Sequence, residues 1–187
     1  WVLGIHGPNT TSAIRETVFS EANLENLSWA AQHGTTWGAP YPITWTSIND
    51  AFANCGGSGM TLGLLLAIFI ASNRDLAKMS FIPGIFNINE PIMFGLPIVL
   101  NPIMMVPFIL VPIVNCAIGY FFVSMEIIPP VAYAVPWTTP GPLIAFLGTG
   151  GNWLALLVGF LCLGVATMIY LPFVIAANKV NNMTTNG

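Results

Sequence analysis

The chain has 187 residues, of which 55% are hydrophobic and only 6% are charged, and its net charge is −3. Soluble domains carry about 25% charged residues, so this composition, with a mean hydropathy of +0.77, indicates an integral membrane protein. The chain has only four Lys and Arg residues, which excludes a nucleic-acid partner because such a partner requires a basic surface. Three scattered cysteines (Cys55, Cys116 and Cys162) indicate neither a disulfide framework nor a metal site, and we expect no cofactor.

The N-terminal third predicts peripheral and irregular structure. The chain opens at Trp1 inside an apolar stretch, without an initiator Met or a signal peptide, and we expect it to be part of a longer polypeptide. Residues 12–33 combine charges with apolar residues at helical spacing, which predicts a short amphipathic helix at the interface or against the bundle. Residues 34–57 are rich in glycine and proline and predict loops and broken structure.

The first membrane span is predicted around residues 60–72, which are uncharged and strongly apolar. A spanning helix needs about 20 residues, so this segment must borrow from residues 51–59 or lie nearly upright. Arg74 and Lys78 follow it, and the positive-inside rule places their loop on the cytoplasmic side.

Residues 91–125 carry no formal charge and exceed the length of one span of about 20 residues. Interior prolines disrupt helices, and they recur through the first two-thirds of this stretch. We therefore predict a broken hairpin over about residues 81–101, followed by a kinked spanning helix over about residues 103–125.

Residues 127–151 repeat the high density of proline and glycine and predict a second broken hairpin. Residues 153–178 predict a last span that is interrupted only by Pro172 and ends inside at Lys179. The parity of crossings allows each hairpin to be re-entrant or a pair of full spans. Non-helical backbone survives at membrane depth only when protein buries it or when it lines a wet cavity, which favours re-entrant hairpins. The predicted fold is an all-α polytopic membrane protein with transmembrane helices plus two re-entrant helical hairpins.

Glu90 is the leading candidate for a functional residue. An ionisable group at membrane depth costs about 2.5–3.5 kcal/mol on insertion scales, so proteins that keep one usually use it on a substrate, an ion or a proton. Asn87 and Asn89 add hydrogen-bond donors and acceptors beside it, and Pro91 interrupts the helix there. The alternative role for Glu90 is to cap the next helical leg, and the two roles are compatible.

His6 and Trp137 are further candidates, each with a plain structural alternative. His6 follows an apolar run and precedes Gly-Pro, where it is either a satisfied structural residue or a ligand. Trp137 lies at the predicted tip of the second hairpin, where its indole can lie against the C–H face of a sugar or anchor the chain at the interface. Thr138 and Thr139 offer hydroxyls beside it. Carboxylate, amide and aromatic groups together suit a pyranose.

Three segments carry a family resemblance: GIHGPN at 4–9, PGIFNINEPIMFG at 83–95 and VPWTTPGP at 135–142. They resemble the membrane-embedded C component, EIIC, of the phosphoenolpyruvate-dependent sugar phosphotransferase system, lactose/cellobiose/diacetylchitobiose branch. The resemblance implies that residues 1–187 are the C-terminal transport domain, which binds substrate, of a longer EIIC chain. The N-terminal half, absent here, would mediate homodimerisation in the bacterial cytoplasmic (inner) membrane.

The resemblance also implies roles for individual residues. Glu90 and His6 would hold the 6-hydroxyl region of a β-linked disaccharide and are the catalytic candidates, with Glu90 either removing the proton or only orienting the hydroxyl. The expected substrate-binding residues are His6, Glu90, Asn89, Trp1, Trp137, Thr138 and Asn87. A phosphocysteine on a separate cytosolic IIB component would supply the phosphoryl group.

Two other classes of function remain open from the residues. A proton-coupled secondary sugar transporter would use Glu90 and His6 as a proton relay. A channel or a structural membrane subunit would bind no sugar. The residues leave open which disaccharide is carried and which access state the protein adopts.

Overall fold

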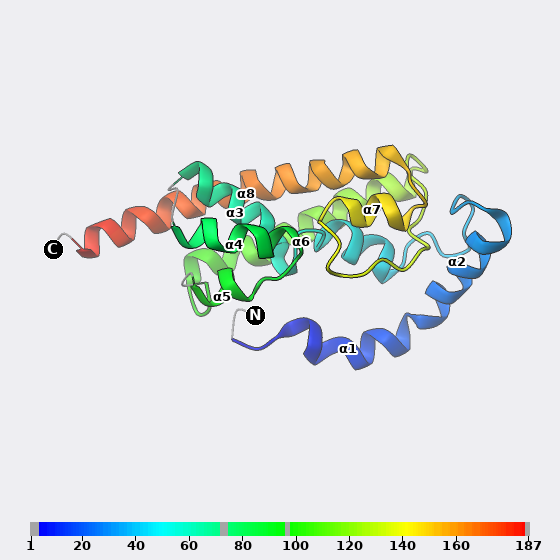
Figure 1. The fold of residues 1–187 in the computed structure, drawn as a ribbon, viewed down its shortest axis with the longest axis horizontal. Coiled ribbons are helices and arrows are strands. Elements are labelled where there is room, and N and C mark those ends of the chain that lie inside the picture. The colour runs from blue at the N-terminus through cyan, green and yellow to red at the C-terminus, as the bar shows by residue number, and fades with distance from the viewer. Residues whose placement is uncertain (1–3, 72–74, 96–97, 186–187) are drawn as a thin grey trace.

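The computed structural model describes residues 4–71, 75–95 and 98–185, and the regular elements in these ranges are helical. Figure 1 shows them as an elongated bundle. In chain order the helices are α1 (Gly7–Val18), α2 (Ser20–His33), η1 (Thr46–Ala53), η2 (Ser58–Met60), α3 (Thr61–Ala71), α4 (Asp75–Ile85), α5 (Glu90–Gly95), α6 (Pro102–Ser124), α7 (Leu143–Gly148) and α8 (Trp153–Thr185).

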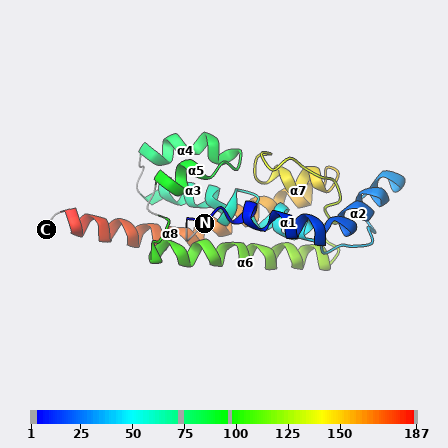
Figure 2. The ribbon, with the colours of Figure 1, turned by 90° about the horizontal axis from the view of Figure 1, so that it is seen from below.

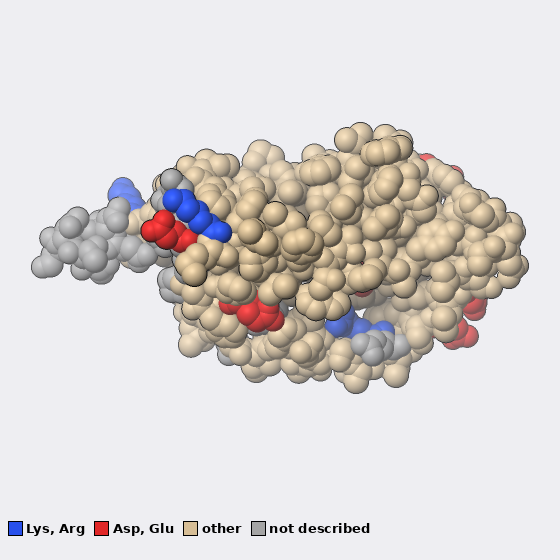
Figure 3. All heavy atoms as spheres, in the orientation of Figure 1, with Lys and Arg blue, Asp and Glu red and all other residues tan. Residues whose placement is uncertain are grey.

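Three helical stretches are long and apolar enough to cross a membrane: Thr46–Ala71, Pro102–Ser124 and Trp153–Val180. The first is 72% buried and therefore forms the centre of the bundle, whereas the other two are 33% buried and leave apolar faces outward. Figure 2 shows α6 along one side of the bundle and α4 and α7 on the other, with α3 and α8 between them. On the face in Figure 3, the charged side chains lie near the ends and lower edge of a broad uncharged surface. The expected all-helical membrane fold is confirmed in this respect.

The first span does borrow preceding residues, as predicted, but it reaches back to Thr46, so part of the predicted loop is wrong. The stretch begins with the π-helix η1, whose Phe52 is buried, and is interrupted before α3. Gly57 and Gly59 adopt left-handed φ angles of 88° and 71° in that interruption. A Cβ at Gly59 would collide with the ring of Phe108, so the interruption is closely packed against α6.

The ends of α6 follow local signals closely. The Asn101 side chain accepts the backbone N–H of Ile103 at 3.0 Å, and Pro102 occupies the first helical position, where its missing N–H costs nothing. The predicted span over 103–125 is confirmed, with Pro107 and Pro112 accommodated inside one helix.

The last span begins where predicted and ends later. The Asn152 side chain accepts the backbone N–H of Ala155 at 3.0 Å and caps the start of α8. The helix then runs to Thr185, past the predicted end at residue 178. Pro172 does not interrupt it, because the flanking residues Tyr170 and Val174 are buried in the core and hold the helix in place.

The first predicted hairpin is present as α4 and α5, although α4 begins before residue 81 and α5 ends before residue 101. Asn87 ends the α4 turn with a φ of 62°, and its N–H donates to the carbonyl of Gly84 at 3.1 Å. The second predicted hairpin has only one helical leg. Residues 129–142 are non-helical because they contain five prolines, and α7 follows them.

The predicted amphipathic helix over 12–33 is two helices, α1 and α2, which meet at Phe19. α1 begins at Gly7, earlier than predicted, with Pro8 in its first turn.

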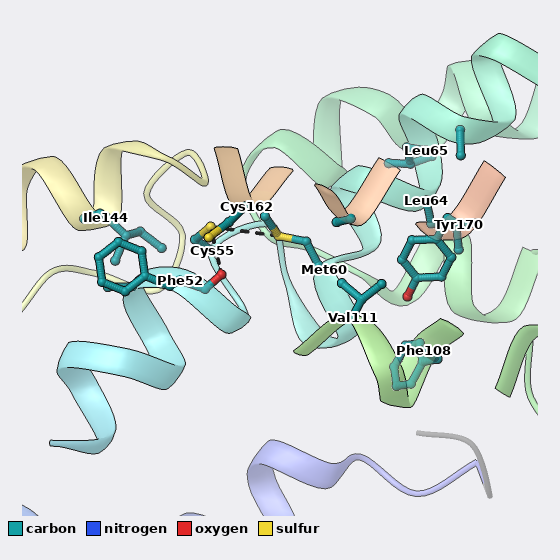
Figure 4. Packing of buried hydrophobic residues seen from close by; sticks show 14 of the residues in the cluster. Phe52, Cys55, Met60, Leu64, Leu65, Phe108, Val111, Ile144, Cys162 and Tyr170 are labelled. Carbon is teal, nitrogen blue, oxygen red and sulfur yellow. Dashed lines mark hydrogen bonds between the residues drawn. The ribbon is translucent and has the colours of Figure 1, made fainter. Parts of the chain in front are cut away.

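The core lies where the interrupted first span meets α6 and α8. Figure 4 shows Tyr170 of α8 beside Leu64, with Val111 and Phe108 of α6 below Met60 and Tyr170. The Tyr170 hydroxyl donates to the carbonyl of Gly59 at 2.6 Å, which satisfies a backbone group freed by the interruption. The core therefore holds the broken segment in one conformation.

Candidate functional site

The structure brings His6 and Glu90 together, although they are far apart in the sequence. Nε2 of His6 lies 3.8 Å from Oε1 of Glu90, and the two side chains are 37% and 52% exposed. Glu90 is the first residue of α5, immediately after the turn that closes α4. The pair is therefore open to a ligand on one side while its backbone is held on the other.

His6 has a structural role through Nδ1, while its Nε2 is the atom that faces Glu90. Its Nδ1 accepts the backbone N–H of Asn9 at 3.2 Å and so caps the N-terminus of α1. Because Nδ1 accepts this bond, it carries no proton, and the neutral ring carries its proton on Nε2. The imidazole therefore presents an N–H toward Glu90. The structural and ligand roles predicted for His6 are compatible.

Glu90 lies in the first turn of α5, where the predicted roles of cap and ligand can be compared. The carbonyl of Asn89 accepts the N–H groups of Ile92 and Met93 at 3.1 and 2.9 Å, as the first turn of α5 requires. In the described part of the chain, the Glu90 carboxylate makes no hydrogen bond to the α5 backbone. Its position in the first turn still favours a negative charge through the helix dipole.

Asn87 and Asn89 fasten the tip of the α4–α5 hairpin, which we define as residues 86–90. Both are only 6% exposed. The Asn87 amide donates to the carbonyls of Trp137 and Thr139 at 2.6 and 2.8 Å. The Asn89 amide oxygen accepts the hydroxyl of Thr61 at 2.5 Å. These two groups therefore tie the tip to the non-helical segment 129–142 and to the start of α3.

The glycine-rich interruption of the first span also packs against the side chain of Asn89. A Cβ at Gly57 would collide with the Asn89 side chain, so only glycine leaves room for the amide there. The glycine-rich segment and the hairpin tip thus fit together although they are distant in sequence.

Trp137 is held at the site through its backbone carbonyl, and Thr138 follows it in the chain. The bond from Asn87 holds the carbonyl of Trp137 beside the tip, while the indole is 68% exposed and the Thr138 side chain is exposed. Because both side chains are exposed, both can face a ligand. Trp1, also an expected site residue, lies outside the described residues.

Sequence reasoning missed Asp50. It lies half-buried in η1, within the first candidate span, and Asn49 donates to its carboxylate at 3.0 Å. The signal was present, because Asp50 is the only Asp, Glu, Lys or Arg between residues 46 and 71. It was overlooked because the neighbouring glycines and prolines favoured a loop.

The chemistry of the site is that of hydroxyl recognition. Among residues 4–71, 75–95 and 98–185, no group of three His, Cys, Asp or Glu side chains could hold a metal ion. A carboxylate acceptor faces an imidazole N–H donor, next to buried amides and an exposed indole. This arrangement can bind a hydroxyl group and accept its proton.

The fold and site together define a polytopic membrane protein with a polar site at a broken helical hairpin, an arrangement typical of transporters. The family described as Phosphotransferase system, EIIC matches residues 1–112, and the chain belongs to this family.

Relatives of known type match almost the whole chain. The cellobiose-specific EIIC component of Lactococcus lactis subsp. lactis (strain IL1403) is 36% identical over 200 residues, which covers 96% of this chain and 40% of that protein. The lactose-specific EIICB component of Streptococcus mutans serotype c (strain ATCC 700610 / UA159) is 39% identical over 180 residues, which covers 93% of this chain and 31% of that protein. The chain therefore spans less than half the length of these relatives.

A solved structure has the same fold. It is the crystal structure of the transporter ChbC, the IIC component from the N,N'-diacetylchitobiose-specific phosphotransferase system. The match has a TM-score of 0.89 and 33% identity, and it covers all of this chain and 44% of ChbC.

Proposed function

We propose that residues 1–187 form the C-terminal transport domain of a longer EIIC protein, which carries a β-linked disaccharide across the bacterial cytoplasmic membrane. The observation that carries the proposal is the His6–Glu90 pair at the hairpin tip of a chain that belongs to the EIIC family. The similarity to cellobiose, lactose and diacetylchitobiose components supports a disaccharide as substrate.

The pair suits the 6-hydroxyl of a sugar. Its two atoms are 3.8 Å apart, which is too far for a direct hydrogen bond but allows one oxygen to lie about 2.8 Å from both. In this pose the hydroxyl accepts from Nε2 of His6 and donates to the carboxylate of Glu90. The hydroxyl thus makes one hydrogen bond as acceptor and one as donor.

Glu90 then acts as the general base for phosphoryl transfer. The phosphocysteine of the IIB component donates the phosphoryl group, so the sulfur–phosphorus bond breaks as the bond between phosphorus and the 6-oxygen forms. Glu90 takes the proton of the hydroxyl, and the sugar phosphate is released inward. The protein supplies position and a base, while the phosphoryl donor resides on the partner.

The remaining parts of the domain follow from this role. The α4–α5 hairpin and residues 129–148 are the two re-entrant segments, and they meet where Asn87 bonds the Trp137 carbonyl. The Trp137 indole is the apolar platform for a sugar ring, with Thr138 beside it, and Asn89 offers a further polar contact. Lys78 and Lys179 face the cytoplasm. The N-terminal half of the whole protein provides the homodimer contact.

The test is uptake by the whole protein. In cells that lack phosphoenolpyruvate-dependent phosphate flow but keep a proton gradient, we expect no accumulation of unmodified cellobiose or diacetylchitobiose. Accumulation there would instead establish the proton-coupled alternative. A binding titration with the same two sugars tests the alternative of a channel or structural subunit that binds no sugar. We expect saturable binding, and its absence would reject a sugar site.

A further inference from the structure

The two members of the His6–Glu90 pair belong to elements that are held very differently. Glu90 follows a hairpin tip bonded through the buried amides of Asn87 and Asn89. His6 caps α1, whose apolar residues Ile14 and Val18 are exposed. The distance between His6 and Glu90 therefore depends on what holds α1 against the bundle.

Arg15 and Phe19 provide that attachment, and both lie against Trp45. The Arg15 guanidinium carbon is 5.6 Å from the centre of the Trp45 ring, and the Phe19 ring stacks on the same indole with centres 5.9 Å apart and planes at 21°. Arg15 also donates from Nη2 to the carbonyl of Pro8 at 2.8 Å. Pro8 lies in the turn that His6 caps, so the guanidinium links that turn to η1.

Asp50 is the charge that faces this attachment. Its carboxylate lies close enough to Arg15 for the two opposite charges to attract each other. Without Asp50, the Arg15 side chain would keep its bond to Pro8 and lose the attraction of the negative charge in η1.

Asp50 is also connected toward Glu90 by a series of hydrogen bonds through side-chain amides. Asn49 donates to Asp50 at 3.0 Å, and Asn54 donates to Asn49 at 3.0 Å. The Asn54 side chain accepts the N–H of Gly59 at 3.2 Å, and its backbone carbonyl accepts the N–H of Gly57 at 2.9 Å. Each donor in this series points toward Asp50, so the carboxylate orders the series as its final acceptor.

The series ends at Gly57 and Gly59, and Gly57 packs against Asn89 of the hairpin tip. Gly57 leaves the room that Asn89 occupies, and Asn89 directly precedes Glu90. Asp50 is thus connected to His6 through Arg15 and α1, and to Glu90 through Asn54 and Gly57.

We propose that Asp50 is a positioning residue that sets the separation of His6 and Glu90. The proposal rests on the proposed function for its consequence in sugar binding, but the separation itself is a property of the protein alone. Asp50 touches neither the sugar nor the phosphoryl group in this scheme, and it acts through the placement of α1 and of the hairpin tip.

A direct test measures the separation without sugar. In the full-length protein in lipid vesicles, Cys55, Cys116 and Cys162 are replaced by Ala, and His6→Cys and Glu90→Cys are joined by a short bifunctional thiosulfonate. We expect Asp50→Asn to lower the cross-linking rate about tenfold and Asp50→Glu to restore much of it. Asp75→Asn is the matched control, because Asp75 pairs with Lys78 on the exposed surface of α4. An unchanged rate in Asp50→Asn would overturn the proposal.

A second measurement separates positioning from general stability. In the wild-type background, we expect Asp50→Asn to weaken cellobiose binding about tenfold, and in a His6→Ala background to weaken it clearly less, because only the placement of Glu90 is then left to disturb. Additive losses would overturn the proposal, because they would mean that Asp50 acts independently of the pair. If Asp50→Asn fails to fold, Arg15→Gln replaces it with the same expectations, since it removes the same attraction from the surface helix. If the wild-type protein binds no sugar, the proposed function is rejected, while the cross-linking result remains valid.

Discussion

The tip of the α4–α5 hairpin and the helix α1 each contribute one side chain to the candidate site, yet they are secured in opposite ways. The tip is bonded through buried amides to two other segments, at Thr61 and at Trp137 and Thr139. α1 contacts the indole of Trp45 through Arg15 and through its C-cap residue Phe19. The hairpin tip that carries Glu90 is thus held at several points, whereas His6 is carried by a helix with fewer such bonds.

This difference assigns different tasks to the two regions. Elements with few buried contacts open at lower free energy than core elements, and binding segments are drawn from them. We expect the hairpin tip to hold Glu90 in one geometry, as a general base requires, and α1 to adjust when sugar enters. Four variants test this contrast, each on one side of it.

The largest expected effect is on turnover. Glu90→Gln retains the shape of the side chain and removes the base, so we expect sugar phosphorylation to fall about 10²–10⁴-fold. Folding should survive, because Glu90 is half exposed and Asn89 satisfies the first turn of α5. Phosphorylation by the full-length protein with phosphorylated IIB measures the first point, and thermal unfolding measures the second. Normal turnover would refute the base role.

The next effect concerns the stability of the fixed side. Asn87→Asp replaces the amide donor with a carboxylate that faces the carbonyls of Trp137 and Thr139. Two buried acceptors lose their donor, and we expect a loss of about 1–3 kcal/mol in the free energy of unfolding. Asn23→Asp on α2 is the matched control and should change Tm little. Equal shifts in the two variants would show that the tip is no better secured than the peripheral helices.

The third effect is on sugar affinity alone. Trp137→Ala removes an exposed indole beside the tip, so we expect the Kd for disaccharide to rise about tenfold, or about 1.4 kcal/mol. Trp137→Phe keeps an aromatic face and should lose less. Isothermal titration measures both, and thermal unfolding should be the same for both. A fall in Tm with unchanged Kd would assign Trp137 to anchoring instead.

The smallest effect concerns the attachment of α1. Phe19→Ala removes one ring stacked on Trp45, a contact worth about 0.5–1.5 kcal/mol. Hydrogen exchange should become faster in α1 and stay unchanged in α5. Phe160→Ala, at an exposed position on α8, is the control. Faster exchange in α5 as well would mean that the two regions are not independently secured.

Local signals explain which predictions succeeded. Asn101 and Pro102 mark the start of α6, and the predicted helix there matches the observed one closely. The combination of Asn87 with Pro91 marks the turn between α4 and α5, because one residue favours a left-handed end and the other a helix start. Such signals act within a few residues, so the sequence displays them directly.

The failures have a different physical origin. Pro172 predicts a break in the last span, but the flanking residues Tyr170 and Val174 are buried and keep α8 continuous. The glycines after η1 predict a loop, but Phe108 and Asn89 fill the space beside them. In both places the packing of distant segments outweighs local propensity, and the η1 error also concealed Asp50.

By itself, the sequence determined that this chain enters a membrane, where its longest helices lie, and that Glu90 occupies a helix break, since hydropathy, charge and proline act locally. Its motifs also indicated the EIIC family. Only the tertiary structure decided that His6 faces Glu90 and that Asn87 and Asn89 hold the hairpin tip. It also decided that Asp50 lies near Arg15 of α1 and accepts a hydrogen bond from Asn49. These relations depend on contacts between residues far apart in the chain, which form only when the helices pack.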